Sequence, residues 1–198
     1  MVKAPRAREH NGAAVQTLLA KPVVRVPGGE LAALRRKASG CHACELWKHA
    51  TQTVFGAGPA GRLLDRALSD AHLDRSTLYL TNTVKHFKYQ LRGKVRLHKR
   101  ANAAEQEACR MWLAAELARL QPRIVVALGA MAAQTVFGTS FSITRERGKW
   151  RRLGPATEGL ATWHPSAILR APDEQRAAMY RQLVHDLREV ARRTGLRA

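Results

Sequence analysis

The stretch Arg123-Ile-Val-Val-Ala-Leu-Gly129 decides the fold class, because it is an unbroken apolar run that ends on a glycine. A continuously apolar strand is buried on both faces, which is typical of a parallel sheet with helices on each side. A second apolar segment, residues 160–163, ends at His164-Pro165. We therefore predict an α/β fold, a three-layer sandwich around a central parallel sheet.

Helical patterns alternate with these segments. The string Asn102-Ala-Ala-Glu105 resembles a capping box and predicts a helix that Pro122 stops, with Cys109 on its apolar stripe. Further helices are predicted over residues 30–39, 61–69, 130–137 and about 172–195, and a short buried strand over residues 78–82. Binding residues are expected where strands end, at Asn82 and His164.

The N-terminal residues differ from the rest of the chain. Residues 1–29 are polar, basic and interrupted by proline and glycine, so we predict a flexible basic arm there and one domain over residues 30–198. The first ten residues lack the apolar stretch of a signal peptide, and no apolar run approaches the ~20 residues of a membrane span. We expect a monomeric cytoplasmic protein that associates with the nucleoid and not with membranes.

The charge balance predicts a polyanionic partner. Thirty-four Lys and Arg against fifteen acids give a formal net charge of +19, which indicates DNA. Seven of these cations fall within sixteen residues, more than solubility requires, and Tyr89 beside them can stack on bases. We interpret this segment as a phosphate-binding loop. Its predicted DNA-binding residues are Lys85, Lys88, Arg92, Lys94, Arg96, Lys99 and Arg100.

The cysteines indicate a metal site. Cys41-His-Ala-Cys44 has the spacing of a ligand pair or of a redox motif, but a redox motif normally opens a helix directly after a strand. Here the pair follows a predicted helix and a glycine, which favours metal. With Cys109 and His86, a site of three thiolates and one imidazole can hold either zinc or a 4Fe–4S cluster, and spacing does not separate the two.

Three segments taken together resemble one family. They are Leu80-Thr-Asn-Thr-Val-Lys-His86, Lys94-Val-Arg-Leu-His98 and His164-Pro-Ser-Ala-Ile-Leu-Arg170, and with Cys41 and Cys44 they are similar to the iron–sulfur uracil-DNA glycosylases of family 4. The likeness is greatest to the X-type branch, which crosslinks itself to uracil-containing DNA. It spans roughly residues 31–195. It implies a uracil-DNA-glycosylase-like sandwich and a structural 4Fe–4S cluster on Cys41, Cys44, His86 and Cys109.

The resemblance also implies roles for single residues. Asn82 would pair with O4 and N3–H of uracil, and His164 would donate a hydrogen bond to O2 as charge builds there during cleavage. Ser166 and Arg170 would hold phosphates of the DNA. His98 would attack the sugar C1′ once uracil has left, although the K-R-R-I-H string of that branch has Val95 at one arginine position here.

One family segment is missing. Gly58-Pro-Ala60 runs straight into Gly61, where the family has a first strand, an acidic catalytic residue and a loop whose aromatic residue stacks on uracil. The sheet is therefore expected to be short of one strand, and enzymatic activity stays open. The resemblance implies recognition of uracil in DNA, with excision and covalent linkage in intact relatives and impaired here, and it leaves open whether single-stranded DNA is preferred. The alternative is a non-catalytic, metal-stapled DNA-binding protein that contacts phosphates only.

Overall fold

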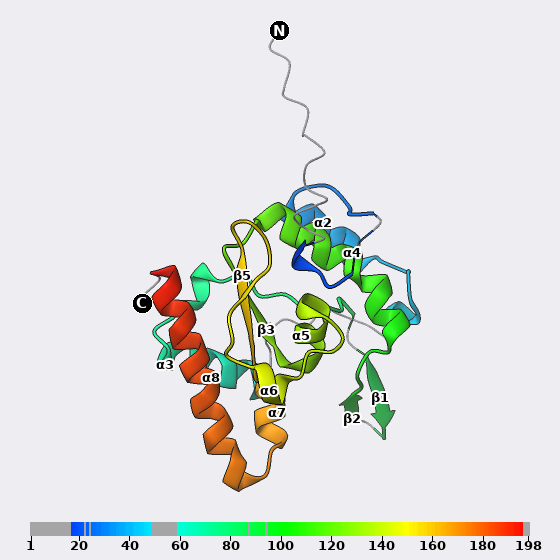
Figure 1. Cartoon of the computed structure of the whole chain (residues 1–198). Helices are drawn as coiled ribbons and strands as arrows, with labels where there is room; N and C mark the ends of the chain where they lie inside the picture. The colour runs from blue at the N-terminus through cyan, green and yellow to red at the C-terminus, as the bar shows by residue number, and fades with distance from the viewer. Residues whose placement is uncertain are drawn as a thin grey trace.

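The structure is a computed structural model that describes residues 17–21, 23, 25–48, 59–86, 88–93 and 95–195, without the side chains of Pro59, Leu91 and residues 95–98. Its elements follow one another as shown in Figure 1. They are α2 (Leu31–Ser39), η1 (Glu45–Lys48), α3 (Pro59–Asp70), η2 (Arg75–Thr77), β1 (Tyr89–Arg92), β2 (Val95–His98), α4 (Ala103–Leu120), β3 (Ile124–Leu128), α5 (Gly129–Phe137), α6 (Ile143–Glu146), β4 (Arg151–Arg152), β5 (Glu158–Thr162), α7 (Pro165–Arg170) and α8 (Asp173–Thr194).

A small mixed sheet lies at the centre. The described strands pair in the order β3-β5-β4, with β3 parallel to β5 and β4 antiparallel to β5. The predicted parallel pair of apolar strands is confirmed, and its register runs from Ile124 opposite Glu158 to Leu128 opposite Thr162. The sheet differs from the prediction in its antiparallel edge strand, the two-residue β4. The chain is therefore of mixed α/β class.

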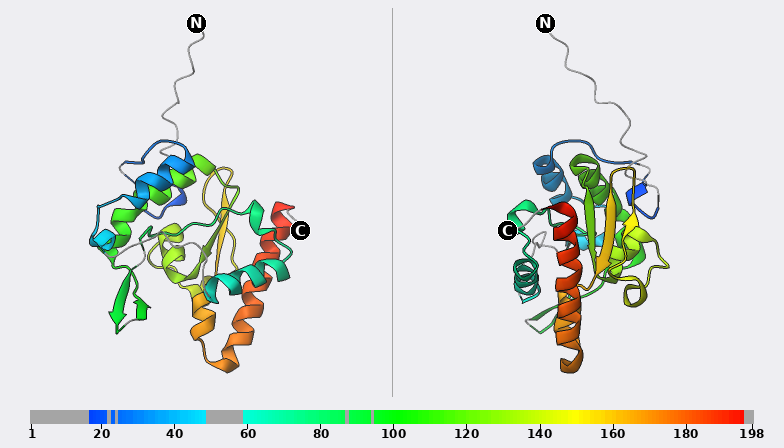
Figure 2. Two further views of the ribbon diagram at one scale, coloured as in Figure 1. Left: turned by 180° about the vertical axis from the view of Figure 1, so that it is seen from behind. Right: turned by 60° about the vertical axis from the view of Figure 1, so that its left-hand side comes forward.

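Helices cover both faces of this sheet, as the two views of Figure 2 show. Alternate strand residues face opposite sides, and Ile124, Val126 and Leu160 pack into a core shared with α3 and α8. Ala127 and Ala161 face the other side, where they pack with Ala133 of α5. None of the described helices combines the length and the apolar character needed to cross a membrane.

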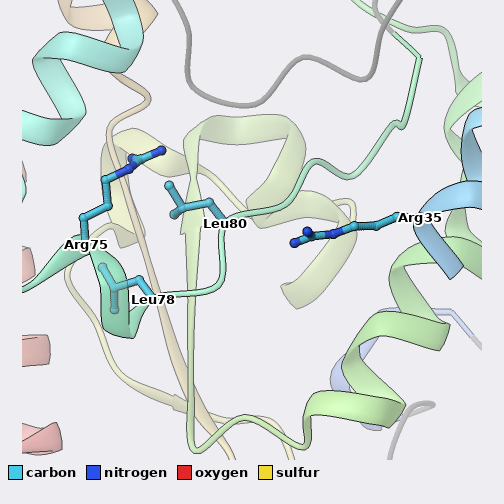
Figure 3. A pocket seen from close by; sticks show the side chains of 4 residues that line it. All are labelled: Arg35, Arg75, Leu78 and Leu80. Carbon is cyan, nitrogen blue, oxygen red and sulfur yellow. The ribbon is translucent and has the colours of Figure 1, made fainter. Parts of the chain in front are cut away.

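The strand predicted over residues 78–82 does not form. A strand exists only where its backbone groups have a partner, and no described residue pairs with this segment. A hollow of about 240 Å³ lies beside the segment instead, lined by Leu78, Leu80, Arg75 and Arg35 of α2 (Figure 3). The apolar pattern of the segment is explained by Leu78 and Leu80, which pack against the core beneath the sheet.

The predicted basic loop contains a β-hairpin. Strands β1 and β2 pair from Tyr89 opposite His98 to Arg92 opposite Val95, and Gly93 turns the chain with a φ of +59°. The hairpin projects at the same end of the molecule as α7, the helix that follows β5 (Figures 1 and 2). Its base is fixed to the body, because Lys88 Nζ binds both carboxylate oxygens of Glu105 and Arg100 donates to Gln134 of α5.

The predicted capping box is confirmed at the start of α4. The side chain of Asn102 accepts from the backbone N–H of Glu105, whose carboxylate accepts from the backbone N–H of Asn102. The arm predicted over residues 1–29 is described only in its second part. Leu18 and Leu19 are buried against α4 and α5, because the long apolar stripe of α4 needs partners beyond the sheet. Residues 1–16 lie outside the described part of the chain.

A buried carboxylate connects α8 to the sheet. Asp186 is 2% exposed and accepts two hydrogen bonds from Arg147 Nη1, at 2.9 and 2.7 Å. Its Oδ2 also accepts from Thr162 Oγ1 at 2.6 Å, at the last residue of β5. The contacts fix the carboxyl end of β5 against α8, because a buried carboxylate is strongly unfavourable unless these donors surround it.

We expect Asp186→Asn to lower the free energy of unfolding by about 3 kcal/mol, since it leaves the partly buried Arg147 guanidinium without its anion. The side chain of Arg147 is 21% exposed, which places the effect at the lower end of the range for buried pairs. Urea unfolding measures it as a lower midpoint with an unchanged slope. Asp173→Asn on the same helix, where the carboxylate is 89% exposed, is the matched control and should change little. Equal stability of both variants would contradict this role.

Candidate active site

His164 stands at the turn from β5 into α7, where it is the N-terminal cap of the helix. Its Nδ1 accepts a hydrogen bond from the backbone N–H of Ser166 at 3.1 Å and lies 2.6 Å from Ser166 Oγ. A backbone N–H can only donate, so Nδ1 must be the unprotonated nitrogen of the ring. In the neutral imidazole the proton is therefore on Nε2, which makes Nε2–H a hydrogen-bond donor.

Gly129 fixes where the imidazole lies. It follows the last residue of β3 with a φ of +84°, in the left-handed region that favours glycine. A Cβ atom on Gly129 would lie 2.7 Å from Cβ of His164, closer than two such carbons can approach. The turns that follow β3 and β5 therefore meet at this contact, as expected where two parallel strands end side by side.

The residues that precede His164 are also held. Trp163 Nε1 donates to Gln182 of α8 at 2.7 Å, and Thr162 is bound by Asp186 as described above. Ser166, predicted to bind phosphate, is half-buried with its hydroxyl against His164. Arg170, also predicted to bind phosphate, is exposed at the last residue of α7. The segment from Thr162 to Arg170 is thus a rigid turn that presents one imidazole to solvent.

A second constellation surrounds Asn82. Its own side chain is exposed, whereas the residues on either side of it enter a buried polar cluster. The ammonium of Lys85 donates to Glu116 Oε2 at 2.7 Å, to Thr81 Oγ1 at 2.8 Å and to the backbone carbonyl of Asn82 at 2.8 Å. Thr81 Oγ1 donates in turn to Glu116 Oε2 at 2.7 Å. Asn82 is therefore held by its backbone, and its side chain remains at the surface.

Lys85 is buried, although the sequence predicts it as a phosphate-binding residue at the surface. Its side chain is 2% exposed, and its three N–H donors all bind acceptors inside the protein. Burial lowers the pKa of its ammonium below the ordinary value, and the carboxylate of Glu116 opposes that shift. A cation so enclosed by protein acceptors does not reach a DNA phosphate.

The other predicted phosphate contacts lie on or beside the hairpin. Lys88 is half-buried and paired with Glu105, and Arg100 is exposed with one bond to Gln134. Arg92 and Lys99 are exposed. Lys94 lies outside the described residues, and of Arg96 and His98 the structure gives the backbone only, within β2. The predicted nucleophile thus stands in the strand that pairs with Tyr89.

The four predicted metal ligands lie near the end of α2 and along α4. Cys109 is buried, Cys41 and Cys44 are half-buried, and Nε2 of His86 lies 3.3 Å from the backbone carbonyl of Ser39. Burial raises the pKa of the Cys109 thiol, and the neighbouring Cys41 and Cys44 raise it further. Although the donor chemistry suits zinc or iron, no three of the described cysteines, histidines and acids are close enough together to hold a metal. This arrangement does not itself form a metal centre.

Sequence reasoning missed three residues of these constellations. Glu116 and Asp186 are acids on the otherwise apolar stripes of α4 and α8, and a charge at such a position is a signal of a buried partner. Gly129 was recognised only as the end of a strand. Its contact with His164 depends on how two strands pair, which neither segment reveals by itself.

Comparison with known proteins places these segments in one family. The family model described as the uracil DNA glycosylase superfamily matches residues 43–188. The chain is 30% identical to the type-4 uracil-DNA glycosylase of Archaeoglobus fulgidus over 122 aligned residues. This alignment covers 58% of this chain and 58% of that protein. The type-4 uracil-DNA glycosylase of Pyrobaculum aerophilum is also 30% identical over 122 residues, with 58% of this chain and 59% of the relative covered.

A longer alignment is found with the type-4 uracil-DNA glycosylase of Sulfurisphaera tokodaii. It is 26% identical over 176 residues and covers 71% of this chain and 76% of that protein. The chain thus spans less than three fifths of the first two relatives and about three quarters of this one. Since the family match includes Asn82, the basic hairpin and His164 and extends over well more than half of the sequence, the chain belongs to the uracil-DNA glycosylase superfamily.

Proposed function

We propose that this chain recognises uracil in DNA through Asn82 and His164, and that excision and covalent linkage through His98 are strongly impaired. One observation carries the proposal. The imidazole of His164 is held with Nδ1 as acceptor, so that in the neutral ring Nε2 carries the proton at the carboxyl end of the central parallel strands. A fixed donor of this kind suits the O2 atom of a uracil that has been turned out of the DNA.

The proposed recognition uses hydrogen bonds at two edges of the base. The side-chain amide of Asn82 can donate to O4 and accept from N3–H, a pattern that uracil offers and cytosine does not. His164 Nε2–H would donate to O2 and stabilise the negative charge that develops there as the glycosidic bond breaks. The exposed cations Arg92, Lys99 and Arg100 would hold the DNA backbone near the site.

Impairment is supported by the missing segment and by the contacts of the remaining acids. Helix α3 begins at Pro59, at the junction where the family segment is absent. None of four carboxylates that could stand in for the missing acid is free for that role. Each makes a contact within the protein: Asp65 with Arg75, Glu105 with Lys88, Glu146 with Arg151, and Glu158 with Arg193.

One observation favours the second candidate, a protein that binds DNA phosphates without reading the base. Asn82 does not follow a paired strand, because residues 78–82 have no strand partner among the described residues. The sheet alone therefore does not aim its side chain. Such a protein would bind uracil-containing and cytosine-containing strands equally, and its affinity would fall with salt as phosphate contacts require.

An assay with matched single strands, one containing uracil and one cytosine at the same position, tests the proposal. We expect the uracil strand to bind about tenfold more tightly, because cytosine cannot make the one or two hydrogen bonds that Asn82 makes to O4 and N3–H. Denaturing electrophoresis should show a crosslinked species that is absent or very slow to form, and any trace should vanish in His98→Ala. Equal affinity for both strands would favour phosphate binding alone. Rapid, stoichiometric crosslinking would contradict the proposed impairment.

The proposal includes a structural 4Fe–4S cluster on Cys41, Cys44, His86 and Cys109, implied by the family resemblance. Protein purified without oxygen should then be brown, with broad visible absorption and about four irons per chain. Cys109→Ser should remove most of the colour, whereas Ser39→Ala, next to the site but without a ligand atom, should keep it. A colourless protein with one zinc per chain would contradict the cluster and leave the four-residue site in place. A metal-free, stably folded protein would contradict both.

A further inference from the structure

The buried ion pair of Lys85 and Glu116 also holds two neighbouring groups, the hydroxyl of Thr81 and the backbone carbonyl of Asn82. The side chains are 2% and 5% exposed, so each charge requires several partners to offset its loss of water. Glu116 Oε2 receives two hydrogen bonds, from Lys85 and Thr81. Besides its bonds to Glu116 and Thr81, the ammonium of Lys85 donates a third hydrogen bond, to the backbone carbonyl of Asn82.

These contacts bracket Asn82. Thr81 precedes it, Lys85 follows it by three residues, and both are bound to the same carboxylate oxygen on α4. Because the segment lacks strand pairing among the described residues, the cluster supplies the fixed backbone that a sheet would otherwise provide. The position of Asn82 therefore depends on a helix that lies outside the sheet.

A further contact strengthens the connection to α4. Burial raises the pKa of the Cys109 thiol, and the backbone N–H of Lys85 lies close enough to that thiol to oppose the rise. The loop therefore approaches α4 near Cys109 as well as near Glu116, about two helical turns further along. On the other side of the segment, the guanidinium of Arg35 lies over the ring of Tyr79, 5.2 Å from its centroid. The loop is thus fastened on the side of Glu116, and the side chain of Asn82 is exposed.

We propose that Glu116 is a positioning residue for base recognition: through Lys85 it fixes the backbone of Asn82, so that the Asn82 amide is presented to uracil. One part of this inference, the effect of Glu116 on the preference for uracil, rests on the proposed function. Its structural part, the immobilisation of residues 81–85 by Glu116, stands on the contacts above and is tested separately.

Four variants and two measurements, backbone hydrogen exchange and DNA affinity, test it. Glu116→Gln keeps the shape of the side chain and removes the charge that holds Lys85. We expect hydrogen exchange of the backbone over residues 80–86 to become at least about tenfold faster, since a loop that loses its anchor opens more often, while α8 keeps its protection. The ratio of affinities for uracil and cytosine strands should fall to that of Asn82→Ala, with the cytosine affinity itself unchanged.

The double variant Lys85→Met/Glu116→Leu distinguishes a loss of Asn82 positioning from a loss of protein stability. Replacing a buried ion pair with apolar side chains of similar volume commonly preserves stability, but methionine has no donor for the Asn82 carbonyl. We expect stable protein that still lacks uracil preference and still exchanges rapidly over residues 80–86. Restoration of both properties along with stability would overturn the proposal.

Arg119→Met is the matched control, because it removes an exposed ion pair with Glu30 one turn further along α4. It should change neither readout. If the unchanged protein shows no preference for uracil, the proposed function fails, and the exchange readout still decides the positioning of the loop. Unchanged exchange over residues 80–86 in Glu116→Gln would overturn the inference whatever the DNA measurements show.

Discussion

The parallel pairing of β3 with β5 is the constraint on which the site depends. It aligns Leu128 with Thr162, so that the residues that follow, Gly129 and His164, meet at one edge of the sheet. The absence of a side chain at Gly129 leaves room for the imidazole, and the N–H of Ser166 selects its tautomer. A change in the register of these two strands would separate the glycine from the histidine and leave a histidine with no defined orientation.

Two helices outside the sheet complete the arrangement, each through one buried carboxylate. Asp186 on α8 binds the end of β5 next to His164, and Glu116 on α4 binds the loop that carries Asn82. Replacing a whole buried ion pair with apolar side chains is often neutral for stability, so we infer that these two carboxylates are important chiefly for the geometry of the groups around them. In this chain they fix the two segments that the proposed function uses for recognition, which the small sheet by itself would support weakly. Under that proposal, this explains how base-reading groups can persist where the strand and the acidic residue of the family resemblance are missing.

The sequence predicted those parts of the fold whose signals are local. The apolar runs of β3 and β5 and the capping box at Asn102 follow from residue order alone, and the structure contains all of them. It could not predict features that depend on partners distant in the chain. Residues 78–82 have a strand pattern but no pairing partner, and Lys85 sits in a basic run but points inward to Glu116. For the site, the motif residues were found by resemblance, whereas the groups that hold them became visible only in three dimensions.

The most direct measurement of the central claim compares Gly129→Ala with Gly154→Ala. A methyl group at Gly129 must displace His164, whereas a methyl group at Gly154 makes contacts of 3.9 Å or longer and needs no left-handed backbone. If strand pairing positions the base-reading imidazole, Gly129→Ala will lower the ratio of the affinity for a uracil strand to that for a strand with a stable abasic site at the same position by about tenfold, the value of one well-placed hydrogen bond. Gly154→Ala will leave the ratio unchanged. A folded Gly129→Ala protein that retains the full ratio would contradict the account.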